Sequence, residues 1–210
     1  MALPGTFFEY LSAFITIVLA LAVTDMLVSL HKLIRARARV RWRVLPLAAA
    51  FFILLTLMTL FFEIWRYTRL EGISFYGLLI LLLSPLLGFL SAAAVMPDDV
   101  PEQGIDLWDH YIAERRYIWG TMFLGFAIDF VFKLPPMLGR SVELYWVAQF
   151  VLLNGLAVAA SAMMALARDR RLHALGLAIL FVLAQYGYAV WEIEAPNARE
   201  PAVSAPAAPR

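Results

Sequence analysis

The sequence contains no cysteine, and this absence removes several classes of function at once. Without thiols the chain has no disulfide, no thiolate nucleophile, no cysteine-ligated zinc and no iron–sulfur cluster. Charge is scarce as well, because 16% of the residues are charged, whereas soluble domains carry about 25%. The 17 basic and 16 acidic residues leave a net charge of +1. Overall charge therefore indicates no nucleic-acid partner.

Histidine is rare, and recognisable catalytic patterns are missing. The three histidines, His31, His110 and His173, stand in or beside hydrophilic loops, and none has the spacing of a metal-binding motif. A haem held between membrane helices would need a histidine inside a helix. The chain also lacks a glycine-rich phosphate loop and a nucleophile motif. We therefore expect no cofactor and no metal, and an enzyme is the less favoured interpretation.

Hydrophobic residues make up 63% of the chain, and the mean hydropathy is +0.78. About 20 apolar residues in a helix cross a bilayer, and lipid offers the backbone no hydrogen-bond partner outside helices and closed barrels. We predict an all-α bundle of six transmembrane helices in one domain, 1–194, with an uncleaved first helix. A disordered Ala/Pro-rich tail is expected at 195–210. The six runs cover residues 7–30, 44–66, 73–96, 117–138, 143–167 and 172–193.

Basic residues gather in the loops on one side of this predicted bundle. The loops after the first, third and fifth runs hold eleven of the 17 basic residues. Since Lys and Arg mark cytoplasmic loops, this side is expected to be cytoplasmic, with both termini outside. The first loop is short and is expected to contact anionic lipid head groups, through Arg35, Arg37, Arg39, Arg41 and Arg43.

The loop at 98–114 is acidic although it lies on the basic side. From Ile105 onward its apolar residues recur at helical spacing. This pattern predicts a short amphipathic helix at the membrane interface over 104–116. A solvated acidic face is the simpler interpretation. The alternative is a docking surface for a basic partner, which would make the protein a membrane scaffold or sensor subunit.

Asp129 is the most unusual ionisable residue within the runs, since a charge at bilayer depth costs on the order of 3 kcal/mol. It lies about 18 Å from Tyr117 along a helix, and Lys133 follows at the favourable i+4 spacing. Three neutral polar residues on other helices are expected at similar depth: Ser84, Asn154 and Gln185. The leading hypothesis is passage or exchange of H⁺ or a monovalent cation through this cluster. A self-neutralising pair at Asp129 and helix-packing contacts elsewhere are the alternative.

Asp25 and Glu63 are shallower carboxylates. Asp25 lies about 8–9 Å from the basic boundary, where it can offset Lys32 and the arginines after it, so it is a second-rank member of the ion pathway. Glu63 is expected to pair with Arg66. Asp25 and Asp129 also align when the two three-helix halves are superposed in sequence, which suggests a 3+3 inverted repeat. The sequence leaves the oligomeric state open.

The stretch ALAVTDMLVSLHKLIRARARVRWRVLPL resembles a widespread family of bacterial six-helix inner-membrane proteins. The shared features are a first span with Thr and a polar residue, a Leu-rich exit and an Arg-rich loop that ends in Val-Arg-Trp. The resemblance covers the first two runs. It implies a multi-pass protein of the bacterial inner membrane, in contact with lipid, and it implies no particular activity.

Overall fold

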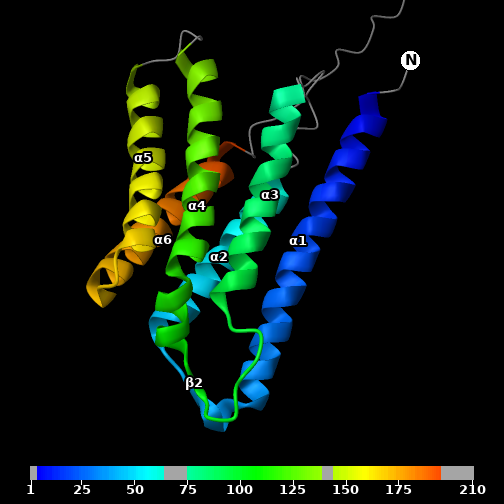
Figure 1. Cartoon of the computed structure of the whole chain (residues 1–210). Helices are drawn as coiled ribbons and strands as arrows, with labels where there is room; N and C mark the ends of the chain where they lie inside the picture. The colour runs from blue at the N-terminus through cyan, green and yellow to red at the C-terminus, as the bar shows by residue number, and fades with distance from the viewer. Residues whose placement is uncertain (1–3, 64–74, 139–143, 195–210) are drawn as a thin grey trace, which may run out of the picture.

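A computed structural model describes residues 4–63, 75–138 and 144–194, with side chains at 9–63, 77–135 and 144–185. This part of the chain forms six helices, so the prediction of an all-α fold is confirmed (Figure 1). The predicted tail at 195–210 lies outside the described residues. The helices are α1 (Pro4–Arg35), α2 (Val44–Glu63), α3 (Phe75–Val95), α4 (Leu107–Leu138), α5 (Leu144–Leu166) and α6 (Arg170–Glu194).

Five of the helices, α1 to α5, are long and apolar enough to cross a membrane. Their length and composition agree with the first five predicted runs. The sixth run also forms a helix, α6, which is inclined to α4 and α5 in Figure 1. Whether α6 crosses the membrane stays a prediction, and so does the inverted repeat.

The connections after α1, α3 and α5 lie at one end of the bundle, the lower end in Figure 1. The eleven basic residues of these connections and their flanking turns are therefore gathered at that end, which we call the basic end. The hydrophobic core runs inward from there. Its largest fully buried side chains include Ile53 and Leu57 of α2, Trp119 of α4 and Met164 of α5.

The amphipathic segment predicted at 104–116 is not a separate interfacial helix. It is the beginning of α4, which runs without a break from Leu107 to Leu138. The helix starts at Leu107 because the Asp106 carboxylate accepts a hydrogen bond from the Trp108 backbone N–H at 2.9 Å. Its apolar face packs inside the bundle, and the Trp108 and Tyr111 rings lie 5.8 and 5.1 Å from the His173 ring on α6. The helical spacing predicted for 104–116 was correct, but its apolar face packs against another helix of the protein.

Two short strands join the connections at the basic end. Strand β1 (Val40–Arg41) pairs in parallel with β2 (Ile105–Asp106), and a 3₁₀ turn at Arg37–Arg39 precedes β1. Gly104 leads into β2 with a φ of 86°, a conformation that favours glycine. The two-stranded pairing fixes the start of α2 beside the start of α4.

Candidate functional site

At the end of α4 opposite the basic end, which we call the outer end of the bundle, Glu63, Asp129 and Lys133 form an ion cluster, the outer cluster. Lys133 Nζ lies 2.8 Å from Asp129 Oδ1 and 3.6 Å from Glu63 Oε1. The predicted Asp129–Lys133 pair is thus confirmed. Its extension to Glu63 on α2 was not predicted, since Glu63 was expected to pair with Arg66, which lies outside the described residues. Among the described side chains, two carboxylates share one ammonium, and these three groups sum to a formal charge of −1.

The ion pair with Glu63 also sets the depth of this cluster. Glu63 is the last residue of α2, and a rise of about 1.5 Å per residue places it roughly 28 Å from Val44. That distance is close to the whole hydrocarbon thickness of about 30 Å. The cluster therefore lies toward the outer end of the bundle.

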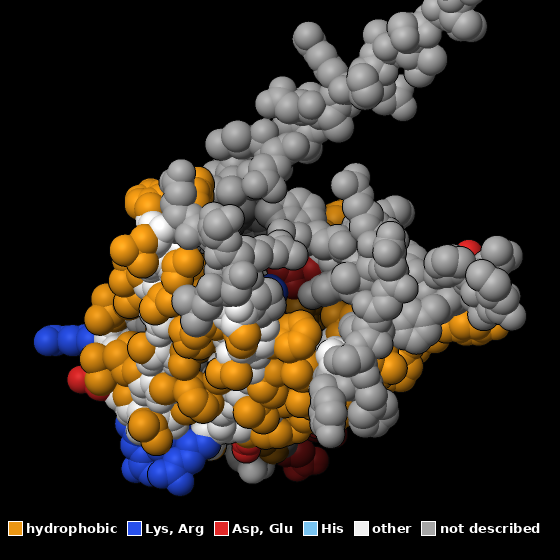
Figure 2. Space-filling view, turned by 90° about the horizontal axis from the view of Figure 1, so that it is seen from above, with side chains coloured by type: hydrophobic (Ala, Val, Ile, Leu, Met, Phe, Trp, Pro, Cys, Tyr) orange, Lys and Arg blue, Asp and Glu red, His pale blue; other side chains and the backbone are white. Residues whose placement is uncertain are grey.

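Seen from the outer end, acidic and basic side chains are visible in a recess among hydrophobic ones (Figure 2). The three side chains of the cluster are 25–35% exposed, so they are only partly shielded. A separate groove of about 610 Å³ lies on the other side of α4, toward α3, and its lining is apolar. The groove offers no polar route for an ion. Its lining residues are Ile80, Ala127, Ile128, Val131, Phe132 and Pro135.

The other predicted pathway residues do not join the cluster. Ser84 and Asn154 each donate a hydrogen bond to a carbonyl of their own helix, Ile80 O at 3.4 Å and Phe150 O at 2.9 Å. Gln185 is exposed on α6. Asp25 is half-buried on α1 and makes no hydrogen bond or ion pair with any described residue. The structure thus assembles Asp129 and Lys133 but not the four-helix cluster.

Toward the basic end of the bundle, about one turn before α3 ends, a hydroxyl pair links α3 to α4. Ser91 Oγ and Thr121 Oγ1 lie 2.7 Å apart, and Ser91 is fully buried. Both hydroxyls also reach carbonyls of their own helices, so the pair is well satisfied. Sequence reasoning missed it because Ser and Thr are common in membrane helices and neither residue breaks the hydrophobic run.

Near the basic end, a buried hydrogen-bond chain links α4 to α6. Trp119 Nε1–H donates to Tyr111 Oη at 2.8 Å, and Tyr111 Oη lies 2.7 Å from His173 Nδ1. On its other side, His173 Nε2 lies 3.2 Å from Ala167 O. The three side chains are fully buried. We call this arrangement the inner chain.

The hydrogen bonds of the inner chain fix the state of the histidine. Tyr111 Oη accepts the hydrogen bond of the indole N–H, and the arrangement that pairs every buried polar atom has Tyr111 donate its own proton to His173 Nδ1. The other ring nitrogen, Nε2, carries the proton and donates to the Ala167 carbonyl. His173 is therefore neutral in this arrangement, and every polar atom of the chain has a partner.

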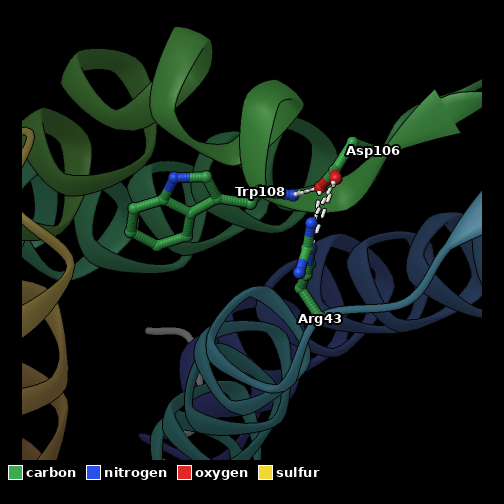
Figure 3. Close-up of polar contacts among 3 residues, drawn as sticks. All are labelled: Arg43, Asp106 and Trp108. Carbon is green, nitrogen blue, oxygen red and sulfur yellow. Dashed lines mark hydrogen bonds and ion pairs between the residues drawn. The ribbon is translucent and has the colours of Figure 1, made fainter.

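At the basic end itself, the basic and acidic loops bind each other. Arg43 Nε and Nη2 donate to Asp106 at 3.2 and 2.9 Å (Figure 3), and Lys32 Nζ lies 3.2 Å from Asp99 Oδ1. The hydrogen bond from Arg43 lowers the pKa of the Asp106 carboxyl, and the same contact raises the pKa of Arg43. Two acids of the predicted docking loop thus already have basic partners within the chain.

The arginines expected to contact lipid remain at the surface. Arg35, Arg37, Arg39 and Arg41 are exposed, and the Arg43 side chain is 45% exposed despite its ion pair. Lipid contact and a docked partner both stay predictions. Within the described side chains, no three acidic or histidine residues gather closely enough to hold a metal ion.

The helices define the class of this protein, a multi-pass membrane protein with an all-α transmembrane bundle. Comparisons with protein-family models, with curated proteins and with solved structures found no match. Function must therefore be argued from the polar centres of α4.

Proposed function

We propose that this protein passes protons, or in second place a monovalent cation, across the inner membrane of a bacterium. In this proposal the basic end faces the cytoplasm, as its Lys and Arg content favours, and α6 completes a six-helix bundle. The observation that carries the proposal is the outer cluster, in which two carboxylates from α2 and α4 share one lysine.

The charge balance of the outer cluster favours a cationic substrate. A purely structural ion pair needs one acid for one base, whereas the described side chains of the cluster hold two acids for one base, and the second carboxylate adds a negative charge in a costly environment. A bound proton or cation would neutralise that charge. Carboxylates in membrane helices serve proton relays in many pumps and transporters, which supports the same function.

Helix α4 connects the outer cluster to further groups that exchange protons. Polar contacts connect α4 to three other helices: the outer cluster to α2, the Ser91–Thr121 pair to α3 and the inner chain to α6. Hydroxyls and a neutral imidazole both donate and accept protons. Thr121 lies about 12 Å from Asp129 and about 15 Å from Tyr111 along the helix axis, so water would have to bridge these intervals.

The nature of these groups favours a proton over a metal cation. A monovalent metal ion needs several oxygen ligands arranged around it, as carbonyl rings provide in channels. The Ser91–Thr121 pair offers two hydroxyl oxygens that already form hydrogen bonds with each other and with carbonyls of their own helices. The inner chain offers a single imidazole and a phenol.

The experiment measures proton uptake into liposomes that contain the purified protein. A potassium gradient with valinomycin sets the membrane potential, and a trapped pH-sensitive dye reports the flux. We expect a potential-driven flux in the wild type that falls at least ten-fold in Asp129→Asn. The matched control is Asp25→Asn, which removes a half-buried carboxylate without a described partner and should keep the flux.

Two outcomes would contradict the proposal. Wild-type flux equal to that of empty liposomes at every potential and pH gradient would exclude transport under this assay. Equal losses in Asp129→Asn and Asp25→Asn would show that the outer cluster has no special role. Replacing the proton gradient by sodium or potassium gradients separates the proton from the monovalent cation.

A further inference from the structure

A small pocket of about 120 Å³ lies at the basic end, between the starts of three helices. It is lined by Arg43, Leu45, Trp108 and Arg170. Arg43 immediately precedes α2, Trp108 is the second residue of α4, and Arg170 is the first residue of α6. Two arginines and two apolar residues thus border the pocket, and the surface that lines it is mostly apolar.

Arg170 is the cation of this pocket that has no other engagement. It is exposed and makes no hydrogen bond or ion pair with any described residue. Its neighbour Arg171 differs, because it does not line the pocket. An arginine offers five N–H donors in a planar fork that matches two oxygens of a phosphate.

The ion pair with Asp106 holds Arg43 in place but occupies only part of its hydrogen-bond donors. Its Nε and Nη2 atoms donate to Asp106, which also accepts from the Trp108 backbone (Figure 3). Nη1 makes no hydrogen bond with a described residue, so its two protons are available. In Figure 3 the indole of Trp108 extends away from the ion pair. The contact with Asp106 therefore orients Arg43 beside the pocket.

The surrounding charge and the helix ends reinforce an anion site. The first turns of α2, α4 and α6 present their positive dipole ends toward this region. The basic end as a whole holds eleven basic and seven acidic residues. Local acids offset part of this charge, and the remainder is positive.

We propose that this pocket binds the phosphate of an anionic phospholipid. A lipid is favoured over free phosphate because the pocket lies where α2 and α4, which are long and apolar enough to cross a membrane, begin, and because the surface that lines it is mostly apolar. Val44, which stands between the lining residues Arg43 and Leu45, is hydrophobic and 75% exposed. Basic pockets between helices at the cytoplasmic side suit such head groups. This inference is independent of proton transport.

The test compares ligands by native mass spectrometry and thermal unfolding of the detergent-purified protein. Phosphatidylglycerol should bind and raise the unfolding temperature more than phosphatidylcholine does. Inorganic phosphate at the same concentration should do neither. In Arg170→Gln the apparent affinity for phosphatidylglycerol should fall about five-fold, as expected for loss of one basic residue near lipid. Arg171→Gln and Arg37→Gln, which remove exposed arginines outside the pocket, should each bind as the wild type does.

Each other outcome overturns the proposal. Equal losses in Arg170→Gln, Arg171→Gln and Arg37→Gln would mean that lipid sees only the overall charge of the basic end. Equal binding of phosphatidylglycerol and phosphatidylcholine would show that the negative charge is not recognised. Stabilisation by inorganic phosphate alone would identify a site for a free anion. Arg170 makes no hydrogen bond or ion pair with a described residue, and an unchanged unfolding temperature of lipid-free Arg170→Gln would separate loss of binding from misfolding.

Discussion

Replacing Tyr111 by phenylalanine removes one oxygen from the fully buried inner chain and leaves two polar atoms without partners. Trp119 Nε1–H loses its acceptor, and His173 Nδ1 loses its donor. Each buried polar group left unpaired costs about 1–3 kcal/mol. We therefore expect the free energy of unfolding to fall by about 2–6 kcal/mol, with little change in packing volume.

The assay is reversible unfolding in mixed micelles, followed by circular dichroism. The control is Tyr117→Phe, which removes the same hydroxyl from an exposed tyrosine on the same helix and should change stability by less than about 0.5 kcal/mol. A double variant of Tyr111→Phe with Trp119→Phe should cost less than the sum of the two single changes. If Tyr111→Phe were as mild as Tyr117→Phe, the hydrogen-bond account of the inner chain would be wrong.

Three further changes test other parts of the structure. Lys133→Met leaves Glu63 and Asp129 without their shared cation. Because these side chains are partly exposed, we expect the free energy of unfolding to fall by about 1–2 kcal/mol in the same micelle assay. Adding Asp129→Asn and Glu63→Gln to this variant should reverse the loss. Gly104→Ala places a Cβ 2.5 Å from Arg39 O at a φ of 86°, so the free energy of unfolding should fall by about 1–3 kcal/mol. In the control Gly120→Ala, the new Cβ meets no atom within 4 Å, and stability should not fall. Arg43 lowers the pKa of Asp106, so the stabilisation by this ion pair should be complete above the ordinary carboxyl pKa and should decline as the pH falls below that pKa. When the free energy of unfolding is measured against pH, this decline should be absent in Asp106→Asn.

The helices and the Asp129–Lys133 pair could be predicted because both depend on local spacing. Hydrophobic run length located α1 to α5, and the i+4 relation placed Lys133 beside Asp129. The helical period of 104–116 was also readable. What local spacing could not reveal was that its apolar face meets His173 of α6 and not lipid.

The contacts that were missed all join segments far apart in the chain. Glu63 of α2 contacts Lys133 of α4. Arg43 contacts Asp106 because strands β1 and β2 pair, and each strand has only two residues, too few to show a period in the sequence. His173 was placed beside a loop because it stands at the start of the sixth predicted run, three residues after α6 begins, where a boundary is hard to locate. Only tertiary packing brings these residues together.

The most direct test of the central claim is the potential-driven proton flux of Asp129→Asn measured beside that of Asp25→Asn. The account predicts a wild-type flux that survives in Asp25→Asn and falls at least ten-fold in Asp129→Asn, while both variants remain folded. A wild-type flux no greater than that of empty liposomes, or an equal flux in the two variants, would contradict it.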